Sequence, residues 1–310
     1  MEGCRWRAAG RGLLIEGYSA ARDASAPQLA RLRGFSVSAQ ALRRLTTANA
    51  VMLVLIVATG ATVRLTGSGL GCEHWPGCEP HHFQPKSFHS YIEFSNRVFA
   101  FFTIVVTLLT WALARGRRRL AFAIFLGTLL QAPLGALTVH FGLNPWLVLS
   151  HFLLSVVVLT LGVVLALEVR GRERTRLPAW VPRLGLLVAA AGAVLVVSGT
   201  LATAAGPHPG STVVRRLWSF EPAVYWHVRA TAVFGIAFLV LLVWLVRHGA
   251  PQVRGALVLL GLLGVQMAIG ETQYRTHLPW WLVLVHVATA VTVWAAITAF
   301  VYSLWRPAAA

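Results

Sequence analysis

The sequence predicts an all-α membrane protein with eight transmembrane helices. Of its 310 residues, 57% are hydrophobic and only 12% are charged, a balance that excludes an ordinary soluble domain. Apolar runs of about 20 residues recur along the chain, which is the length that a helix needs to cross a bilayer. A motif of constant spacing also occurs twice. Together these features predict two tandem four-helix bundles related by a pseudo-twofold axis along the membrane normal.

The repeated motif begins at a glutamine and ends at a histidine. Gln131–Gly135 leads to His151, and Gln266–Gly270 leads to His286, in both cases 20 residues from Gln to His (151 − 131 and 286 − 266). A Trp-Leu-Val-Leu run precedes each histidine. An aligned Gln, Gly, Trp and His indicate a duplicated structural unit rather than a chance echo of apolar residues.

Further equivalent positions extend the repeat to four helices. Ser198-Gly199 corresponds to Thr59-Gly60 with an offset of 139 residues, and His227 corresponds to Asn96 with an offset of 131 (227 − 96). The N-terminal half is expected over residues 43–169 and the C-terminal half over 183–305, with a cytoplasmic linker at 170–182. The expected helices span residues 45–65, 92–114, 120–140, 146–168, 183–204, 224–246, 254–273 and 280–303.

The formal charge of +17 predicts the topology. By the positive-inside rule, the arginine-rich segments lie in the cytoplasm, which places both termini there and makes the chain a multi-pass protein of the cell membrane. Topology and contact with anionic lipid account for the charge, so nucleic acid is not an expected partner. The arginines fall at the two termini and in alternate loops: Arg43, Arg44, the run Arg115–Arg119, the run Arg170–Arg176, Arg183, Arg247, Arg254 and Arg306.

Residues 1–42 are rich in Arg, Ala and Ser and lack the apolar core of a secretory signal. We expect a disordered cytoplasmic extension, in which Cys4 is a bystander. A start codon assigned too far upstream would explain the segment equally well.

The loop after the first helix carries Cys72 and Cys78, six residues apart. On the outer side of a membrane a disulfide can form and persist. The pair is either a structural link or a redox-active pair, because a small exposed loop disulfide is more easily reduced than a buried one. The same region holds four histidines that could bind a metal or be solvated: His74, His81, His82 and His89.

The second helix opens with Glu93, Asn96 and Arg97, which lie on one helical face by their i, i+3, i+4 spacing. A carboxylate at the mouth of a spanning helix is a functional candidate, with Arg97 as its expected partner. A purely structural ion pair is the alternative.

Three histidines join these residues in one layer. His151, His227 and His286 fall within the first two turns of helices that run inward from the outer face, as Glu93 and Asn96 do. Two imidazoles facing each other across a four-helix bundle can hold a haem iron, which makes His227 and His286 candidate axial ligands. Zinc is disfavoured because it needs three or four convergent ligands. The N-terminal half has Asn96 opposite His151, which leaves a position for substrate chemistry.

The loop and second-helix motifs resemble those of the haem A synthases. The stretch Gly60–Cys78 reads G-x3-R-x-T-G-S-G-x2-C-x2-W-P-x-C, followed by E-x2-N-R from Glu93 to Arg97. The resemblance covers residues 43–305. Enzymes of this family oxidise a ring methyl of haem O to the formyl group of haem A by successive hydroxylations, for use in terminal cytochrome oxidases.

The resemblance implies haem b between His227 and His286, and the substrate haem O beside His151 with Asn96 and Arg97 nearby. It also implies partners: haem O synthase, cytochrome oxidase assembly factors and membrane lipid, with a homo-oligomer left open. The residues to which it gives a functional role are the carboxylate and the expected disulfide: Glu93, Cys72 and Cys78.

One position departs from the family pattern, which has a histidine where this chain has Asn96. A second ligand to the substrate iron could come from the outer-loop histidines, or the iron could be five-coordinate on His151. Two other functions remain open. A quinol-linked haem b cytochrome fits the paired histidines but not Asn96 or the Trp-Pro loop, and a transporter built from parallel repeats would purify without haem.

Overall fold

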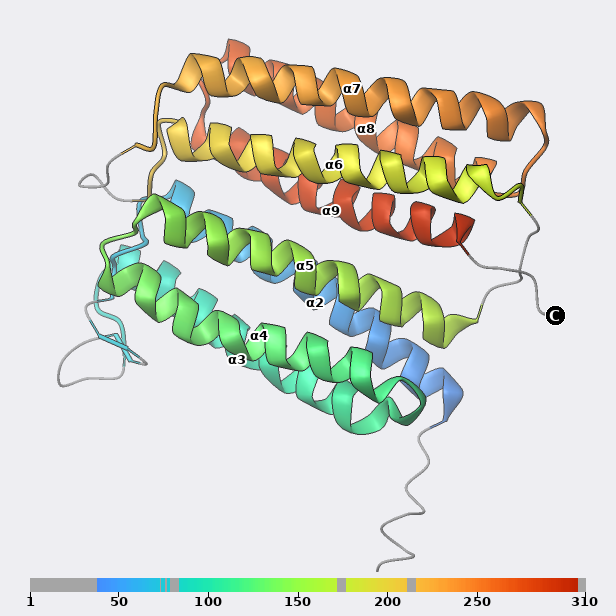
Figure 1. Cartoon of the computed structure of the whole chain (residues 1–310). Helices are drawn as coiled ribbons and strands as arrows, with labels where there is room; N and C mark the ends of the chain where they lie inside the picture. The colour runs from blue at the N-terminus through green and yellow to red at the C-terminus, as the bar shows by residue number, and fades with distance from the viewer. Residues whose placement is uncertain are drawn as a thin grey trace, which may run out of the picture. The chain divides into compact units, whose positions relative to one another are not determined.

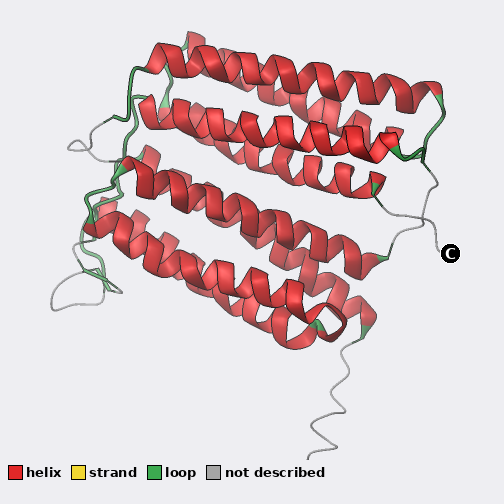
Figure 2. Ribbon diagram, viewed as in Figure 1, coloured by secondary structure: helices red, strands yellow, loops and turns green. Residues whose placement is uncertain are grey.

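A computed structural model describes residues 38–72, 74–75, 77–78, 84–171, 177–210 and 216–305. These residues are helical or form loops and contain no strand (Figure 2). Eight of the helices are long and apolar enough to cross a membrane, which confirms the predicted class. The helices are α2 (Ala39–Leu65), α3 (Phe88–Leu113), the short η1 (Arg115–Arg117), α4 (Arg118–His140), α5 (Pro145–Arg170), α6 (Trp180–Ala205), α7 (Phe220–Arg247), α8 (Val253–Arg275) and α9 (Trp280–Leu304).

The predicted C-terminal ends of the helices agree with the structure to within two residues, but three helices begin four or more residues earlier than expected. α2, α3 and α7 start four to six residues before the predicted 45, 92 and 224. Their first turns are polar, so hydropathy does not detect them. In α3 a capping box between Ser87 and Ser90 satisfies the free amides of that turn. Because α2 begins at Ala39, the last four residues of the expected extension are helical, while Cys4 lies outside the described residues.

Residues 42–310 form one compact unit. Figure 1 shows α2–α5 lying together and α6–α9 lying together. α4 packs against α3 and α5, α6 packs against α7 and α9, and α5 meets α9 between the two groups. The pseudo-twofold axis and the domain boundary at 170–182 stay predictions.

The two halves differ in their cores at equivalent positions of α3 and α7. The α7 residues are large, apolar and at most 1% exposed: Phe234, Phe238 and Leu241. The α3 residues, 131 positions earlier, are buried threonines whose hydroxyls donate to carbonyls of the preceding turn: Thr103, Thr107 and Thr110. The halves therefore share a helix pattern while their interiors have different chemistry.

The loops α2–α3 and α6–α7 meet at one end of the bundle. Arg64, at the end of α2, donates through Nε to the carbonyl of His208 (3.1 Å) and through Nη2 to that of Thr203 (3.0 Å). The amide of Gly69 donates to the carbonyl of Gly210 (3.2 Å), whose φ of +103° suits glycine. These bonds fix the two halves to each other at the end that carries the cysteines.

Candidate functional site

The predicted site residues all lie near this same end. Glu93 and Asn96 follow the first residue of α3 by five and eight positions (93 − 88 and 96 − 88), and the three histidines follow the starts of α5, α7 and α9 by six or seven. Asn96 and His227 therefore fall in the third turn rather than the first two. The reason is the early start of α3 and α7.

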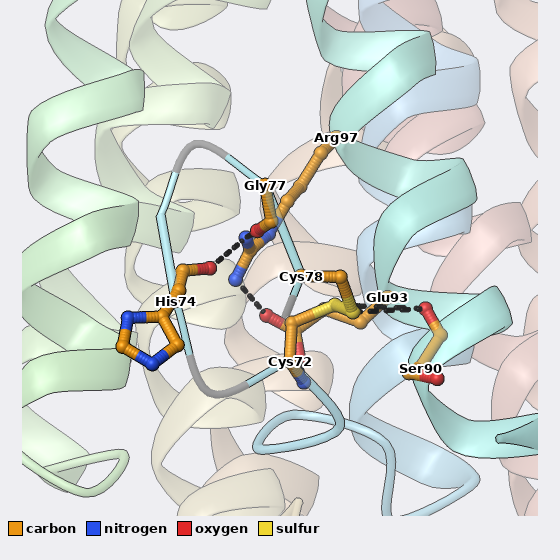
Figure 3. A network of polar contacts seen from close by, with 7 residues as sticks. All are labelled: Cys72, His74, Gly77, Cys78, Ser90, Glu93 and Arg97. Atoms are coloured by element: carbon orange, nitrogen blue, oxygen red, sulfur yellow. Dashed lines mark hydrogen bonds and ion pairs between the residues drawn. A yellow bond between two sulfur atoms is a disulfide. The ribbon is translucent and has the colours of Figure 1, made fainter. Parts of the chain in front are cut away.

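Glu93 is a buried carboxylate with two donors. Only 4% of the residue is exposed to solvent. Oε2 accepts from the backbone amide of Cys72 at 2.9 Å, and Oε1 accepts from Nη2 of Arg97 at 2.6 Å (Figure 3). The predicted Glu93–Arg97 pair is confirmed. Charge-assisted bonds of this kind hold a carboxylate in a defined position.

Arg97 also holds the cysteine loop. Its Nη1 donates to the carbonyl of His74 at 2.6 Å and to that of Gly77 (Figure 3). One guanidinium therefore joins the acid of α3 to two points of the loop. Its predicted contact with a cofactor is untested.

The disulfide between Cys72 and Cys78 is present. Contrary to the expectation of an exposed loop disulfide, the two residues are only 2% and 0% exposed. Their Sγ atoms lie 3.6 and 4.0 Å from the carbonyl oxygen of Ser90, against the first turn of α3. The prediction missed this burial because it depends on Arg97 drawing the loop onto the helix.

Two of the four outer-loop histidines, His74 and His89, lie in the described part of the chain. His89 is exposed, and its Nδ1 shares a hydrogen bond with the hydroxyl of Ser68 (2.8 Å). His74 accepts a hydrogen bond from Arg97 through its backbone carbonyl. His81 and His82 lie outside the described residues. Among the residues that the structure covers, no group of three or more His, Cys, Asp and Glu is placed to hold a metal.

Each site histidine lies with Cε1 against a glycine of a neighbouring helix. A Cβ atom added to Gly135 would lie 3.4 Å from Cε1 of His151. The corresponding distances are 2.9 Å from Gly199 to His227 and 3.0 Å from Gly270 to His286. The absence of a side chain at Gly199 and Gly270 lets the rings of His227 and His286 lie this close, whereas a Cβ atom on Gly135 would make an ordinary van der Waals contact with His151.

On the helix of each glycine, a polar residue forms a hydrogen bond with the histidine. Nε2 of Gln131 and of Gln266 donates to the carbonyl of the histidine 20 residues later, at 3.1 Å in both halves. Ser198 shares a hydrogen bond with Nδ1 of His227 (3.0 Å). No role of Gln131, Gln266 or Ser198 was predicted from the sequence, although the repeat that contains them was the available signal.

Two of the three imidazoles have a ring nitrogen available to an iron, whereas both ring nitrogens of His286 lie 3.2 Å from Nε2 of Gln266. Nδ1 of His151 is buried with no hydrogen-bond partner. Ser198 occupies Nδ1 of His227, which leaves Nε2 as the ligand atom, the arrangement typical of axial histidines. That His227 and His286 bind the same iron stays a prediction.

The acid and its loop are features of the first half. The position of α7 that corresponds to Glu93 is Val224 (224 − 93 = 131). One half thus contains one site histidine and a buried carboxylate, and the other contains two site histidines without that acid.

Comparison with known proteins places these features in one family. Residues 43–298 match the model of the COX15-CtaA family, described as cytochrome oxidase assembly protein. A protein of Bacillus pumilus named heme A synthase is 36% identical over 141 residues, 42% of this chain and 45% of that protein. A protein of the same name from Listeria monocytogenes serotype 4a is 34% identical over 40% of this chain and 43% of its own length. Both matches span less than half of the relative. Another, from Shewanella oneidensis, is 24% identical over 83% of this chain and 94% of its length.

Proposed function

This chain belongs to the COX15-CtaA family of cytochrome oxidase assembly proteins, and we propose that it oxidises the methyl group of haem O to the formyl group of haem A. The relatives named heme A synthase support this assignment. Haem O is the substrate, and haem b is the resident cofactor. We expect two kinds of partner: the enzyme that supplies haem O, and cytochrome oxidase assembly factors.

The observation that carries the proposal is the buried Glu93 network. A protein that only relays electrons needs axial ligands but no buried acid beside one of them. Here a carboxylate, an arginine and a disulfide-closed loop are built into one half, whereas the equivalent of Glu93 in the other half is a valine. This asymmetry favours substrate chemistry in the first half and electron transfer in the second.

The two halves then have separate tasks. His227 and His286 would hold haem b, which supplies one-electron transfer when bound. His151, kept in place by Gln131, would bind the iron of haem O. Because the histidine follows the glutamine by 20 residues in both halves, we expect the two haem sites to lie at the same distance from the loop end of the bundle.

Glu93 lies one turn before Asn96 on α3, next to the proposed position of the substrate. Conversion of a methyl to a formyl group with water as the oxygen source releases four protons and four electrons, and the electrons must leave through haem b to an external electron acceptor. A fixed carboxylate can stabilise positive charge developing at the methyl carbon or take up one of those protons. Cys72 acts through its backbone amide, so the disulfide positions Glu93 without touching the substrate.

Haem extraction tests the proposal. The protein is purified from cells that also make haem O synthase, and the haems are separated and identified by mass. We expect haem b, haem O and haem A. Haem b alone would support a plain cytochrome instead, and a preparation without haem would support a transporter.

Localisation and orientation follow from the arginine distribution. We expect a multi-pass protein of the cell membrane with both termini in the cytoplasm and the Cys72–Cys78 loop outside. The Cys72–Cys78 disulfide is buried, so the outer face is tested at an exposed position of the same loop. In the variant Lys86→Cys, a membrane-impermeant thiol reagent applied to intact cells should modify residue 86 but not Cys4. Unfolding with denaturant and reductant before labelling serves as the control, since it makes all the cysteines reactive. Labelling of Cys4 alone in intact cells would invert the topology.

A further inference from the structure

The first half has no histidine at the position equivalent to His227. It does have similar residues at the positions equivalent to Ser198 and Gly199. Thr59 and Gly60 occupy the places of Ser198 and Gly199, and Asn96 occupies that of His227. Thr59 Oγ1 donates to Asn96 Oδ1 at 2.7 Å, as Ser198 bonds the histidine ring at 3.0 Å. The polar contact between the two helices is therefore the same in both halves.

The glycine contact is different. A Cβ atom on Gly199 would lie 2.9 Å from His227, whereas a Cβ atom on Gly60 would meet no atom within 4 Å. Asn96 is shorter than histidine, and its oxygen is directed to Thr59. Its carboxamide is therefore turned to the neighbouring helix, and the space beside Gly60 is open to at least 4 Å from an added Cβ atom.

His89, one of the two described outer-loop histidines, does not reach this space. His89 precedes Asn96 by seven residues on the same helix, which is about 10 Å along the axis. Its ring is bonded to Ser68. The donor that remains at the position is the amide NH2 of Asn96, which makes no hydrogen bond to the described part of the chain.

We propose that the haem of the first half is bound by His151 alone, and that its other face, between Gly60 and the Thr59–Asn96 pair, is a binding site for a small exogenous ligand such as carbon monoxide, cyanide or imidazole. This inference rests on the proposed function, because it requires a haem beside His151. Asn96 Nδ2 is the hydrogen-bond donor to the ligand. The haem of the second half, closed by His227, takes no such ligand.

The test uses the purified protein with its bound haems and optical spectroscopy. We expect the reduced wild type to bind carbon monoxide at one of its two haems, and the oxidised protein to turn that haem from high-spin to low-spin when imidazole is added. Asn96→His should remove carbon monoxide binding and give a low-spin spectrum without imidazole. His227→Asn, which reproduces the first-half arrangement in the second half, should create a second carbon monoxide site.

A second pair of variants does not depend on replacing Asn96. Gly60→Leu should fill the space and weaken imidazole binding by at least about tenfold. Gly235→Leu is the matched control, since Gly235 is also a helical glycine with no atom within 4 Å of an added Cβ atom but lies in α7, away from the first half. Its imidazole affinity should equal that of the wild type.

The outcomes separate this inference from the proposed function. Two low-spin haems in the wild type, neither of which binds carbon monoxide, would overturn the inference even if haem A is made. Equal imidazole affinities of Gly60→Leu and the wild type would also overturn it. A first-half haem that binds carbon monoxide in a protein that makes no haem A would support the inference and refute the proposed function.

Discussion

Glu93→Gln is expected to lower haem A formation at least about a hundredfold, the usual effect of removing a group that handles charge or protons at a reacting centre. Glutamine keeps the size of the side chain and can still accept the amide of Cys72. It loses the negative charge and the ion pair with Arg97. Haem b should stay bound, because its proposed ligands lie in the other half. The measurement is the haem content of the purified variant, in which haem O or a hydroxylated intermediate should accumulate.

Glu271 supplies a matched control for this experiment. It forms the same i, i+4 ion pair with an arginine, Arg275, at 2.5 Å, but both side chains are at least 60% exposed. Glu271→Gln should leave haem A formation close to that of the wild type. Wild-type yield from Glu93→Gln would remove the carboxylate from the mechanism and leave it a structural role in holding the loop.

His286→Ala is expected to remove haem b or convert it to a high-spin form. The substitution deletes a proposed axial ligand and the ring that lies against Gly270, so the site loses both an iron ligand and part of its wall. Haem A formation should stop, since the proposed haem b would pass the electrons of the oxidation, one at a time, to an external electron acceptor. Visible and paramagnetic resonance spectra of the purified variant measure the change.

His248→Ala controls for the loss of a histidine in general. His248 follows the end of α7 at the opposite end of the bundle, where its ring bonds the carbonyl of Trp244. The visible spectrum of His248→Ala should match that of the wild type. If His286→Ala keeps the low-spin haem b spectrum, the ligand assignment is wrong, and another histidine must bind the iron.

The sequence predicted those features that depend on local spacing. Apolar length gave the eight helices, the i, i+4 spacing gave the Glu93–Arg97 pair, and the cysteine spacing allowed the disulfide. The polar first turns of α2 and α3 were missed because hydropathy records only their apolar continuation. The capping box at Ser87 was a signal that could have extended α3.

Contacts between distant segments could not be predicted in the same way. Arg64 bonds carbonyls that lie 144 and 139 residues further along the chain, and the burial of the disulfide depends on Arg97 reaching back to the loop. The role of Gly60, Gly135 and their counterparts appears only when an added Cβ atom is measured against the next helix. The sequence repeat shows that these glycines occupy equivalent positions, but it does not predict which side chains lie opposite them.

The open contact at Gly60 has a consequence for how such proteins diverge. Asparagine and histidine codons differ only in their first base, and the glycine that would accept an imidazole is already in place opposite Asn96. Under the proposed ligand assignment, a single nucleotide change at this position therefore decides whether the first-half haem has one histidine ligand or two. The same exchange in the second half would open a coordination position without creating a reaction site, because Val224 stands there in place of Glu93.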